Sequence, residues 1–138
     1  MLYTASNVSS IAQYGAIGAL EGSQQCLADF KTELKARRDL FYAGIRDVAP
    51  QVFSGNPPEG AFYVFPSIAG CLGKTSPGGK RIDTDADFAL ALLEEKHVAA
   101  VQGAAYGMSP YIRISYATDT ASLREACARI QEFCKGLA

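Results

Sequence analysis

Apolar residues recur at helical spacing in two long segments of the chain. Between residues 24 and 48, and again between residues 119 and 137, hydrophobic side chains follow one another at or near every third or fourth position. This spacing is typical of a helix with one buried face, so we predict a helix over each segment. The residues expected to face inward are Leu27, Phe30, Leu34, Phe41, Ile45 and Val48 in the first helix and Leu123, Cys127, Ile130, Cys134 and Leu137 in the second.

Two further helices are predicted from caps and composition. Thr84 and Asp87 have the spacing of a capping box, which predicts a helix over 84–96. Near the N-terminus, Ser6 or Ser9 can cap another helix. That helix is rich in alanine and glycine, and so many small residues indicate close packing against another element, which this chain need not supply.

Strands are predicted where the pattern alternates or forms a short apolar run. Residues 111–116 alternate, with one set of side chains toward a core and the other set containing Arg113. Residues 61–65 are apolar on both faces, so we expect a strand that is covered on both sides. Short strands are predicted at 52–54 and 98–101. The order of elements predicts an α+β fold in two layers, a small sheet with helices packed on it.

Composition and charge narrow the functional classes. The chain has 138 residues, of which 49% are hydrophobic and 20% charged, so it can bury the core of a domain and disorder is not expected. A net charge of −1 without a long basic run argues against nucleic acid and anionic membranes as partners. No apolar run approaches a membrane span, and the first residues do not resemble a signal peptide. We expect a cytoplasmic protein without a membrane partner.

The four cysteines do not predict a disulfide framework or a metal site. Cys127 and Cys134 fall on one helix, separated along its axis by roughly 10 Å, which is too far for a disulfide. Cys26 and Cys71 are not part of a C-x-x-C pair, and only one histidine, His97, is present to help them bind a metal. Reduced thiols, buried or partly buried, are expected, and no metal site is predicted.

Arg113 is the candidate for binding chemistry. It shares one face of its predicted strand with Tyr111 and Ser115. A guanidinium held on a rigid strand can donate two parallel hydrogen bonds to a carboxylate, and it does not lose its charge. From this strand alone the alternative is a solvated arginine on a half-exposed strand, and six residues do not decide between the two.

The long loop 70–83 combines basic residues with Ser76 and two glycines, a composition that raises the possibility of a phosphate site. The loop lacks the spacing of a P-loop, and no helix begins directly behind the glycines. A mobile surface excursion is therefore expected there.

Five segments stand in order along the chain, at 6–13, 37–39, 58–66, 92–95 with 98–103, and 111–118. Together they resemble the C-terminal part of a class I pyridoxal-phosphate-dependent aminotransferase of the aspartate aminotransferase type. The resemblance covers nearly the whole chain, and the order and spacing of the segments make it specific although each is weak alone. It implies the C-terminal small domain of the fold-type I transferases.

The resemblance implies roles for four residues. Arg113 matches the arginine that binds the α-carboxylate of the amino-acid substrate, and Phe62 matches an aromatic residue near the mouth of the active site. Ser6 and Asn7 match a segment that lies beside the cofactor pocket of the partner subunit in the family's homodimer. A helix cap remains an equally good explanation for these two residues.

Two departures from the family pattern matter. Leu2 stands where the aspartate-specific branch carries an arginine for the distal carboxylate. Either a residue elsewhere binds the distal group, or the substrate is not dicarboxylic. In addition, no lysine of this chain lies in the family's Ser-x-x-Lys context of the Schiff-base lysine. We therefore expect no catalytic residue in this chain and no pyridoxal phosphate bound to it alone.

The interpretation is a substrate-closing small domain that requires an N-terminal catalytic domain absent from this sequence. Residues 1–22 are expected to form a segment that contacts another domain or the dimer partner, and residues 23–138 the small domain. The intact enzyme would transfer an amino group between an amino acid such as aspartate and a 2-oxo acid. Aspartate, an aromatic amino acid and prephenate are all compatible with Arg113 as substrates. The alternative is a free-standing, non-enzymatic α+β module for binding or oligomerisation.

Overall fold

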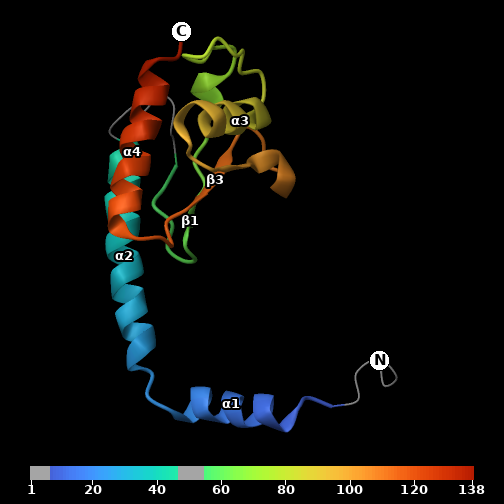
Figure 1. The fold of residues 1–138 in the computed structure, drawn as a ribbon, viewed down its shortest axis with the longest axis vertical. Helices are drawn as coiled ribbons and strands as arrows, with labels where there is room; N and C mark the ends of the chain where they lie inside the picture. Colours follow the sequence, from blue (N-terminus) through green and yellow to red (C-terminus); the bar gives the residue numbers. More distant parts are fainter. Residues whose placement is uncertain (1–6, 47–54) are drawn as a thin grey trace. The chain divides into compact units, whose positions relative to one another are not determined.

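The computed structural model describes residues 7–46 and 55–138 (Figure 1). Its contacts define two compact units, residues 1–32 and 33–138, and the boundary falls inside helix α2 (Gln25–Arg46). The predicted strand at 52–54 lies outside the described residues, as do Ser6, Leu2 and Val48.

The N-terminal unit contains helix α1 (Ser10–Glu21) and the first turns of α2. Ser9 caps α1 by accepting a hydrogen bond from the backbone N–H of Ala12. No residue of α1 is buried, and every described residue of this unit is exposed. The predicted inward stripe of α2 is therefore wrong at its start, where Leu27 and Phe30 are exposed, because nothing among the described residues covers that part of the helix.

The C-terminal unit is built on three short antiparallel strands, β1 (Tyr63–Val64), β2 (Val101–Gln102) and β3 (Ile112–Ser115). Strand β3 is central, in the order β1-β3-β2. The register places Tyr63 opposite Ser115 and Val101 opposite Arg113. Strands β1 and β3 lie within the predicted segments and are shorter than predicted. The prediction of a buried strand at 98–101 is wrong, since β2 shares only Val101 with it and Val101 is exposed.

Helices α3 (Asp85–Lys96) and α4 (Thr120–Lys135) pack against each other in this unit and begin at well-formed caps. Thr84 and Asp87 form the predicted capping box. Asp119 caps α4 by accepting a hydrogen bond from the N–H of Ser122 at 2.9 Å. Hydrogen bonds with Thr84 lower the pKa of Asp87, and hydrogen bonds with Ser122 lower the pKa of Asp119.

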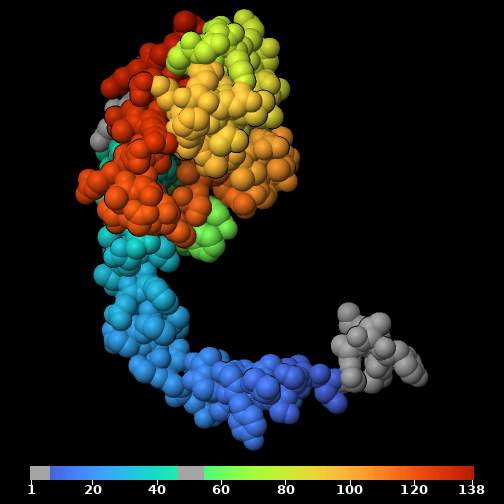
Figure 2. Space-filling model, viewed as in Figure 1, coloured from blue at the N-terminus to red at the C-terminus, as the bar shows by residue number. Residues whose placement is uncertain are grey.

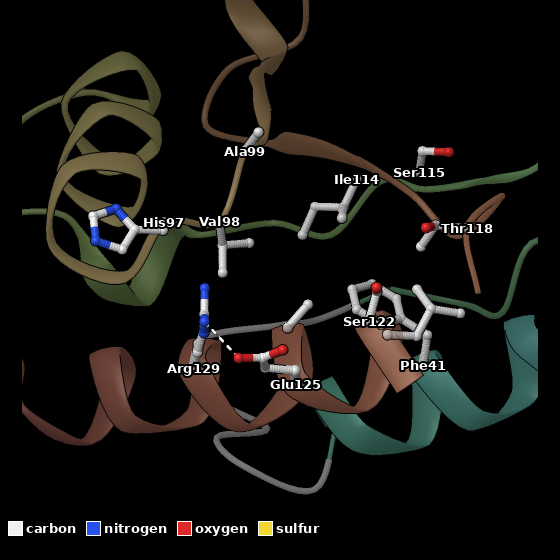
Figure 3. Close-up of a pocket in the computed structure, with 12 residues that line it drawn as sticks. Phe41, His97, Val98, Ala99, Ile114, Ser115, Thr118, Ser122, Glu125 and Arg129 are labelled. Atoms are coloured by element: carbon white, nitrogen blue, oxygen red, sulfur yellow. Dashed lines mark hydrogen bonds and ion pairs between the residues drawn. The ribbon is translucent and has the colours of Figure 1, made fainter. Parts of the chain in front are cut away.

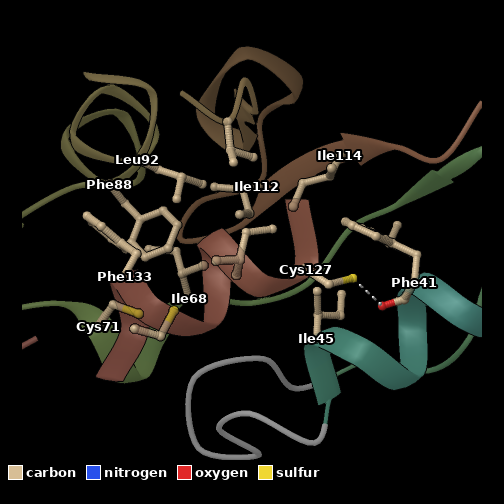
Figure 4. Packing of buried hydrophobic residues seen from close by; sticks show 14 of the residues in the cluster. Phe41, Ile45, Ile68, Cys71, Phe88, Leu92, Ile112, Ile114, Cys127 and Phe133 are labelled. Carbon is tan, nitrogen blue, oxygen red and sulfur yellow. Dashed lines mark hydrogen bonds between the residues drawn. The ribbon is translucent and has the colours of Figure 1, made fainter. Parts of the chain in front are cut away.

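One hydrophobic core joins the sheet to α3, α4 and the second half of α2 (Figure 4). At its centre, the rings of Phe88 and Phe133 meet edge to face with centroids 5.4 Å apart. Ile112, Ile114 and Tyr116 are all buried, as the alternation of their strand predicts. The stripe predicted for α4 is confirmed, with Leu123, Cys127, Ile130 and Cys134 buried and Leu137 partly buried.

All four cysteines are free thiols. Cys71, Cys127 and Cys134 belong to the core, whereas Cys26 is exposed, contrary to the expectation of burial. Burial raises the pKa of Cys127 to about 11. A hydrogen bond with Cys134, followed by burial, raises the pKa of Cys71 strongly. Cys71 and Cys127 therefore stay protonated, and the three core cysteines act as small apolar side chains.

The loop 70–83 is anchored to α3 through Glu95. The Glu95 carboxylate accepts hydrogen bonds from Ser76 Oγ at 2.6 Å and from the Gly78 N–H at 2.8 Å. The N–H of Lys80 donates to Ser76 Oγ at 3.0 Å, and Ser76 is only 4% exposed. The carboxylate of Glu95 thus accepts the hydrogen bonds of Ser76 and Gly78, which belong to the stretch that the sequence suggested for phosphate binding.

Candidate functional site

Arg113 lies on the central strand, on the face turned away from the core. Its neighbours Ile112 and Ile114 are buried, while Arg113 itself is half-buried. The side chain therefore points to the predicted face. Among the described residues its guanidinium makes no hydrogen bond and no ion pair, so its donors remain available to a ligand.

Two tyrosine rings hold the guanidinium of Arg113. Its central carbon lies 4.4 Å from the ring centroid of Tyr63 and 4.3 Å from that of Tyr106. Tyr63 belongs to β1, and Tyr106 ends the short 3-10 helix η2 (Gly103–Tyr106), which directly follows β2. Because β1 and β2 flank β3 on opposite edges, the two rings come from elements on opposite sides of the strand that carries Arg113. Both contacts lie within the range of a cation–π interaction.

Further aromatic contacts support the two rings. Phe65 stacks on Tyr111 with centroids 5.7 Å apart and meets Tyr106 edge to face at 6.0 Å. The sequence alone did not predict this arrangement, and only part of its signal is local to one segment. Alternation over 61–65 places Tyr63 and Phe65 on one side of the strand, which is the side of Arg113, and this side is lined with aromatic residues rather than simply covered.

Backbone contacts hold η2, and with it Tyr106, in place. The buried carboxylate of Asp85 accepts a hydrogen bond from the N–H of Ala104 at 2.8 Å. The N–H of Gly103 donates to the carbonyl of Tyr111 at 2.7 Å. A side chain at Gly103 would collide with the carbonyl oxygens of Met108 and Tyr111. Figure 2 shows α3 in yellow and η2 in orange side by side on one surface of the C-terminal unit.

Phe62 is 40% exposed, and its ring centroid lies 4.4 Å from that of Tyr63, one of the two rings that contact Arg113. The expectation that segment 61–65 is covered on both sides is wrong at this residue. Ala61 adopts a positive φ of 58°, which delays the start of the strand and turns Phe62 outward. Tyr116 fixes this bend, since its hydroxyl donates to the carbonyl of Ala61 and its N–H to the carbonyl of Phe62, both at 2.9 Å.

Of the pair predicted beside a partner's cofactor, Asn7 is exposed in the N-terminal unit and Ser6 lies outside the described residues. Ser9 rather than Ser6 caps α1.

A hollow of about 320 Å³ opens elsewhere in the C-terminal unit, between α4, segment 97–99 and β3 (Figure 3). Its main charged groups satisfy one another, since Arg129 pairs with Glu125 at 2.5 Å and donates to the carbonyl of Lys96 at 3.3 Å. Arg113 and Phe62 do not line it. Within residues 7–46 and 55–138, no cluster of acidic, histidine or cysteine side chains could hold a metal ion, and no helix is long and apolar enough to cross a membrane.

The lysines do not form a cofactor site. Lys80 is paired with Glu94 and Lys96 with Glu132, while Lys31 and Lys35 lie exposed on α2. No lysine lines the hollow described above. A Schiff base requires an accessible amine held in a pocket beside groups that bind the pyridine ring and phosphate. The described residues therefore do not fit pyridoxal phosphate by themselves.

Known proteins resemble this chain over nearly all of its length. The aspartate/prephenate aminotransferase of Cereibacter sphaeroides is 57% identical over 132 residues, which are 96% of this chain and 32% of that protein. The crystal structure of the aspartate aminotransferase from Rhizobium meliloti superposes with a TM-score of 0.91 at 46% identity, covering 99% of this chain and 34% of that one. The aromatic aminotransferase of Pyrococcus horikoshii gives a TM-score of 0.78 at 30% identity, covering 95% and 32%.

The chain thus spans about a third of the length of the relatives it matches. Its α+β small-domain fold agrees with these solved structures. The model of the family described as "Aminotransferase class I and II" matches residues 2–130. On this match the chain belongs to the class I and II aminotransferases.

Proposed function

We propose that this chain is the substrate-closing domain of an amino-acid aminotransferase and that Arg113 binds the α-carboxylate of the substrate. The observation that carries the proposal is the position of Arg113 and its lack of polar partners among the described residues. It is a half-buried guanidinium on the central strand, turned away from the core and without a hydrogen bond or ion pair among the described residues. Arginine in such a setting recognises carboxylates through two parallel hydrogen bonds.

The carboxylate is the group that both substrates of a transamination share. Amino acids and 2-oxo acids each present it beside the reacting carbon, so one receptor serves both halves of the reaction. Binding there also orients the bond to the α-proton. Relatives of this chain are named for aspartate and prephenate, and we extend that substrate class to the protein that contains this chain.

The remainder of the site belongs to residues beyond this sequence. The proposal includes a homodimer, a catalytic domain with the Schiff-base lysine, and pyridoxal phosphate, which supplies the electron sink for the chemistry when bound. Within this chain, we assign Phe62 to the mouth of the substrate site. We place Ser6 and Asn7, in segment 1–22, beside the partner's cofactor pocket, and assign residues 23–138 to the closing domain.

The alternative of a free-standing binding module is less well supported. Such a module should cover its apolar surface, yet Ile11, Leu20, Leu27 and Phe30 are each more than half exposed. No described feature specifically favours the alternative, so the aminotransferase proposal stands alone.

Substitution of Arg113 by lysine in the full-length enzyme tests the proposal. Lysine keeps the charge but not the planar fork, so kcat/KM for L-aspartate should fall by about tenfold to a hundredfold, roughly 1.4–2.8 kcal/mol of transition-state stabilisation. Arg81→Lys is the matched control, because Arg81 is an exposed loop arginine paired with Asp83. Steady-state kinetics, with circular dichroism to verify folding, would measure both variants.

A folded Arg113→Lys enzyme with kinetics close to those of the wild type would refute the proposed role. Arg113 would then be the solvated strand arginine that the strand alone also allows. An equal loss in Arg81→Lys would show that the assay responds to any change of surface arginine, and would remove the support from Arg113.

A further inference from the structure

We propose that Tyr63 and Tyr106 are positioning residues that form an aromatic clamp on Arg113 and fix its guanidinium for carboxylate binding before the substrate arrives. The clamp consists of the two rings whose centroids lie 4.4 and 4.3 Å from the guanidinium carbon. This inference rests on the proposed function of Arg113, and it adds two residues that the family resemblance did not single out.

The clamp leaves only one direction open for a ligand. The five N–H donors of a guanidinium lie in its plane, while its two faces carry none. In the proposed clamp, the rings of Tyr63 and Tyr106 pack on the two faces and leave the donor-bearing edge for the ligand. A carboxylate can approach along that edge and accept two parallel hydrogen bonds, as a fork-to-fork pair requires.

The clamp also reduces the entropic cost of binding. An arginine side chain has more rotamer freedom than most, and ordering it during association weakens affinity. Here Arg113 has no ion pair or hydrogen bond among the described residues to restrain it, so the two rings are its restraint. A receptor restrained in this way is ordered before the substrate binds.

Each ring is held independently of Arg113. Tyr63 sits in the β1–β3 ladder opposite Ser115. Tyr106 is fixed by η2, whose start is held by the buried Asp85, and its ring rests against the edge of Phe65. Because the supports come from separate elements, the rings set the position of the guanidinium rather than follow it.

The competing explanation is that the rings only fill space around an arginine stem. Leucine would fill that space almost as well, whereas it has no π-face to hold a cation. Phenylalanine keeps the face and loses only the hydroxyl. The difference between leucine and phenylalanine at Tyr63 and Tyr106 therefore separates the clamp from simple packing.

The experiment uses the full-length holoenzyme with L-aspartate as amino donor. Tyr63→Leu and Tyr106→Leu should each raise KM by about threefold to thirtyfold with kcat changed less than about twofold. Tyr63→Phe and Tyr106→Phe should restore KM to within about twofold of wild type. Each Leu substitution is then repeated in an Arg113→Met background, where its effect on KM should largely disappear because no cation remains for the rings to hold.

The outcomes separate this inference from the function on which it rests. If Arg113→Lys impairs KM or kcat/KM while both folded Leu variants keep wild-type KM, the clamp is refuted and the carboxylate site stands. If Arg113→Lys itself has wild-type kinetics, the proposed carboxylate-binding role of Arg113 is refuted, and the clamp that rests on it is refuted as well. Leu effects of equal size in both backgrounds would also overturn the clamp, since the rings would then act without Arg113.

Discussion

Phe30 and Phe41 occupy the same apolar stripe of α2, but their surroundings differ completely. Phe30 belongs to the N-terminal unit and is 65% exposed, whereas Phe41 belongs to the C-terminal unit and is 0% exposed. Periodicity therefore identifies a helix face that is suited to burial. It does not identify what covers that face, and the described residues supply a cover only for the second half of the helix.

The sharpest test of this contrast is to truncate both rings to alanine in this chain. Phe41→Ala should cost about 3–5 kcal/mol of unfolding free energy, because it removes a fully buried ring from the core. Phe30→Ala should change it by no more than about 0.5 kcal/mol. Urea unfolding followed by circular dichroism would measure the two variants.

The contrast between the two halves of α2 would be contradicted if Phe41→Ala and Phe30→Ala lowered the unfolding free energy by similar amounts. A large loss for Phe30→Ala in this chain would mean that the N-terminal unit is covered in solution, for instance by self-association, and a concentration series would reveal it.

Glycine-to-alanine changes in the two units should have opposite signs. Gly103→Ala places a methyl group against the carbonyl oxygens of Met108 and Tyr111, and such overpacking should cost about 1–3 kcal/mol. Gly18→Ala meets nothing within 4 Å on α1 and should raise the stability of that helix by about 0.5–1 kcal/mol. Thermal melts should show a lower Tm for the first variant. Helix content or amide exchange of α1 would measure the effect of Gly18→Ala. A stabilising Gly103→Ala would contradict the close approach of the Met108 and Tyr111 carbonyl oxygens to Gly103.

A smaller change in stability is expected at Ala61, where the backbone of the C-terminal unit is strained. Ala61 has a φ of 58°, a conformation that glycine adopts at lower cost than alanine. Ala61→Gly should therefore stabilise the chain by up to about 1 kcal/mol. Chemical unfolding would measure the change, with Ala128→Gly on the exposed side of α4 as the control that should lose stability. A destabilising Ala61→Gly would show that Tyr116 leaves no strain at this bend.

The smallest predicted effect is a loss of folding stability at acidic pH. The caps of α3 and α4 contain Asp87 and Asp119, whose pKa values are lowered by hydrogen bonds from Thr84 and Ser122, whereas α1 is capped by the uncharged Ser9. Since the unfolded chain takes up these protons first, the stabilisation present above about pH 4 is lost as the pH falls through the folded values.

Asp119→Asn should flatten this acid response, because asparagine still caps a helix but does not titrate. Unfolding at several pH values below 5, compared with the wild type, would measure the change in slope. An unchanged slope would mean that the Asp119 cap does not contribute to the acid sensitivity of the C-terminal unit.

Most elements of the fold could be predicted because their signals are local. The capping box at Thr84 and Asp87 and the alternation around Arg113 depend on neighbouring residues, and both were confirmed. The strand lengths were not predictable. Where pairing stops depends on the partner strand and on the bend at Ala61, and neither is a property of a single segment.

The candidate site was predictable in part. The face on which Arg113 lies follows from the period of its own strand. The aromatic clamp depends on the sheet order, which brings Tyr63 and Tyr106 from segments far apart in sequence to the two sides of Arg113. No pattern within one segment could reveal that meeting. The resemblance to a family named the arginine but not the rings that hold it.

The anchoring of loop 70–83 has a consequence for proteolysis. By composition the loop resembles a linker, and Lys80 and Arg81 offer trypsin two adjacent cleavage sites. A protease must draw several residues of backbone into its active site. Here the bonds from Ser76 and Gly78 to Glu95 must first open. Cleavage at this loop would therefore report the opening of the α3 attachment rather than the presence of an exposed basic pair.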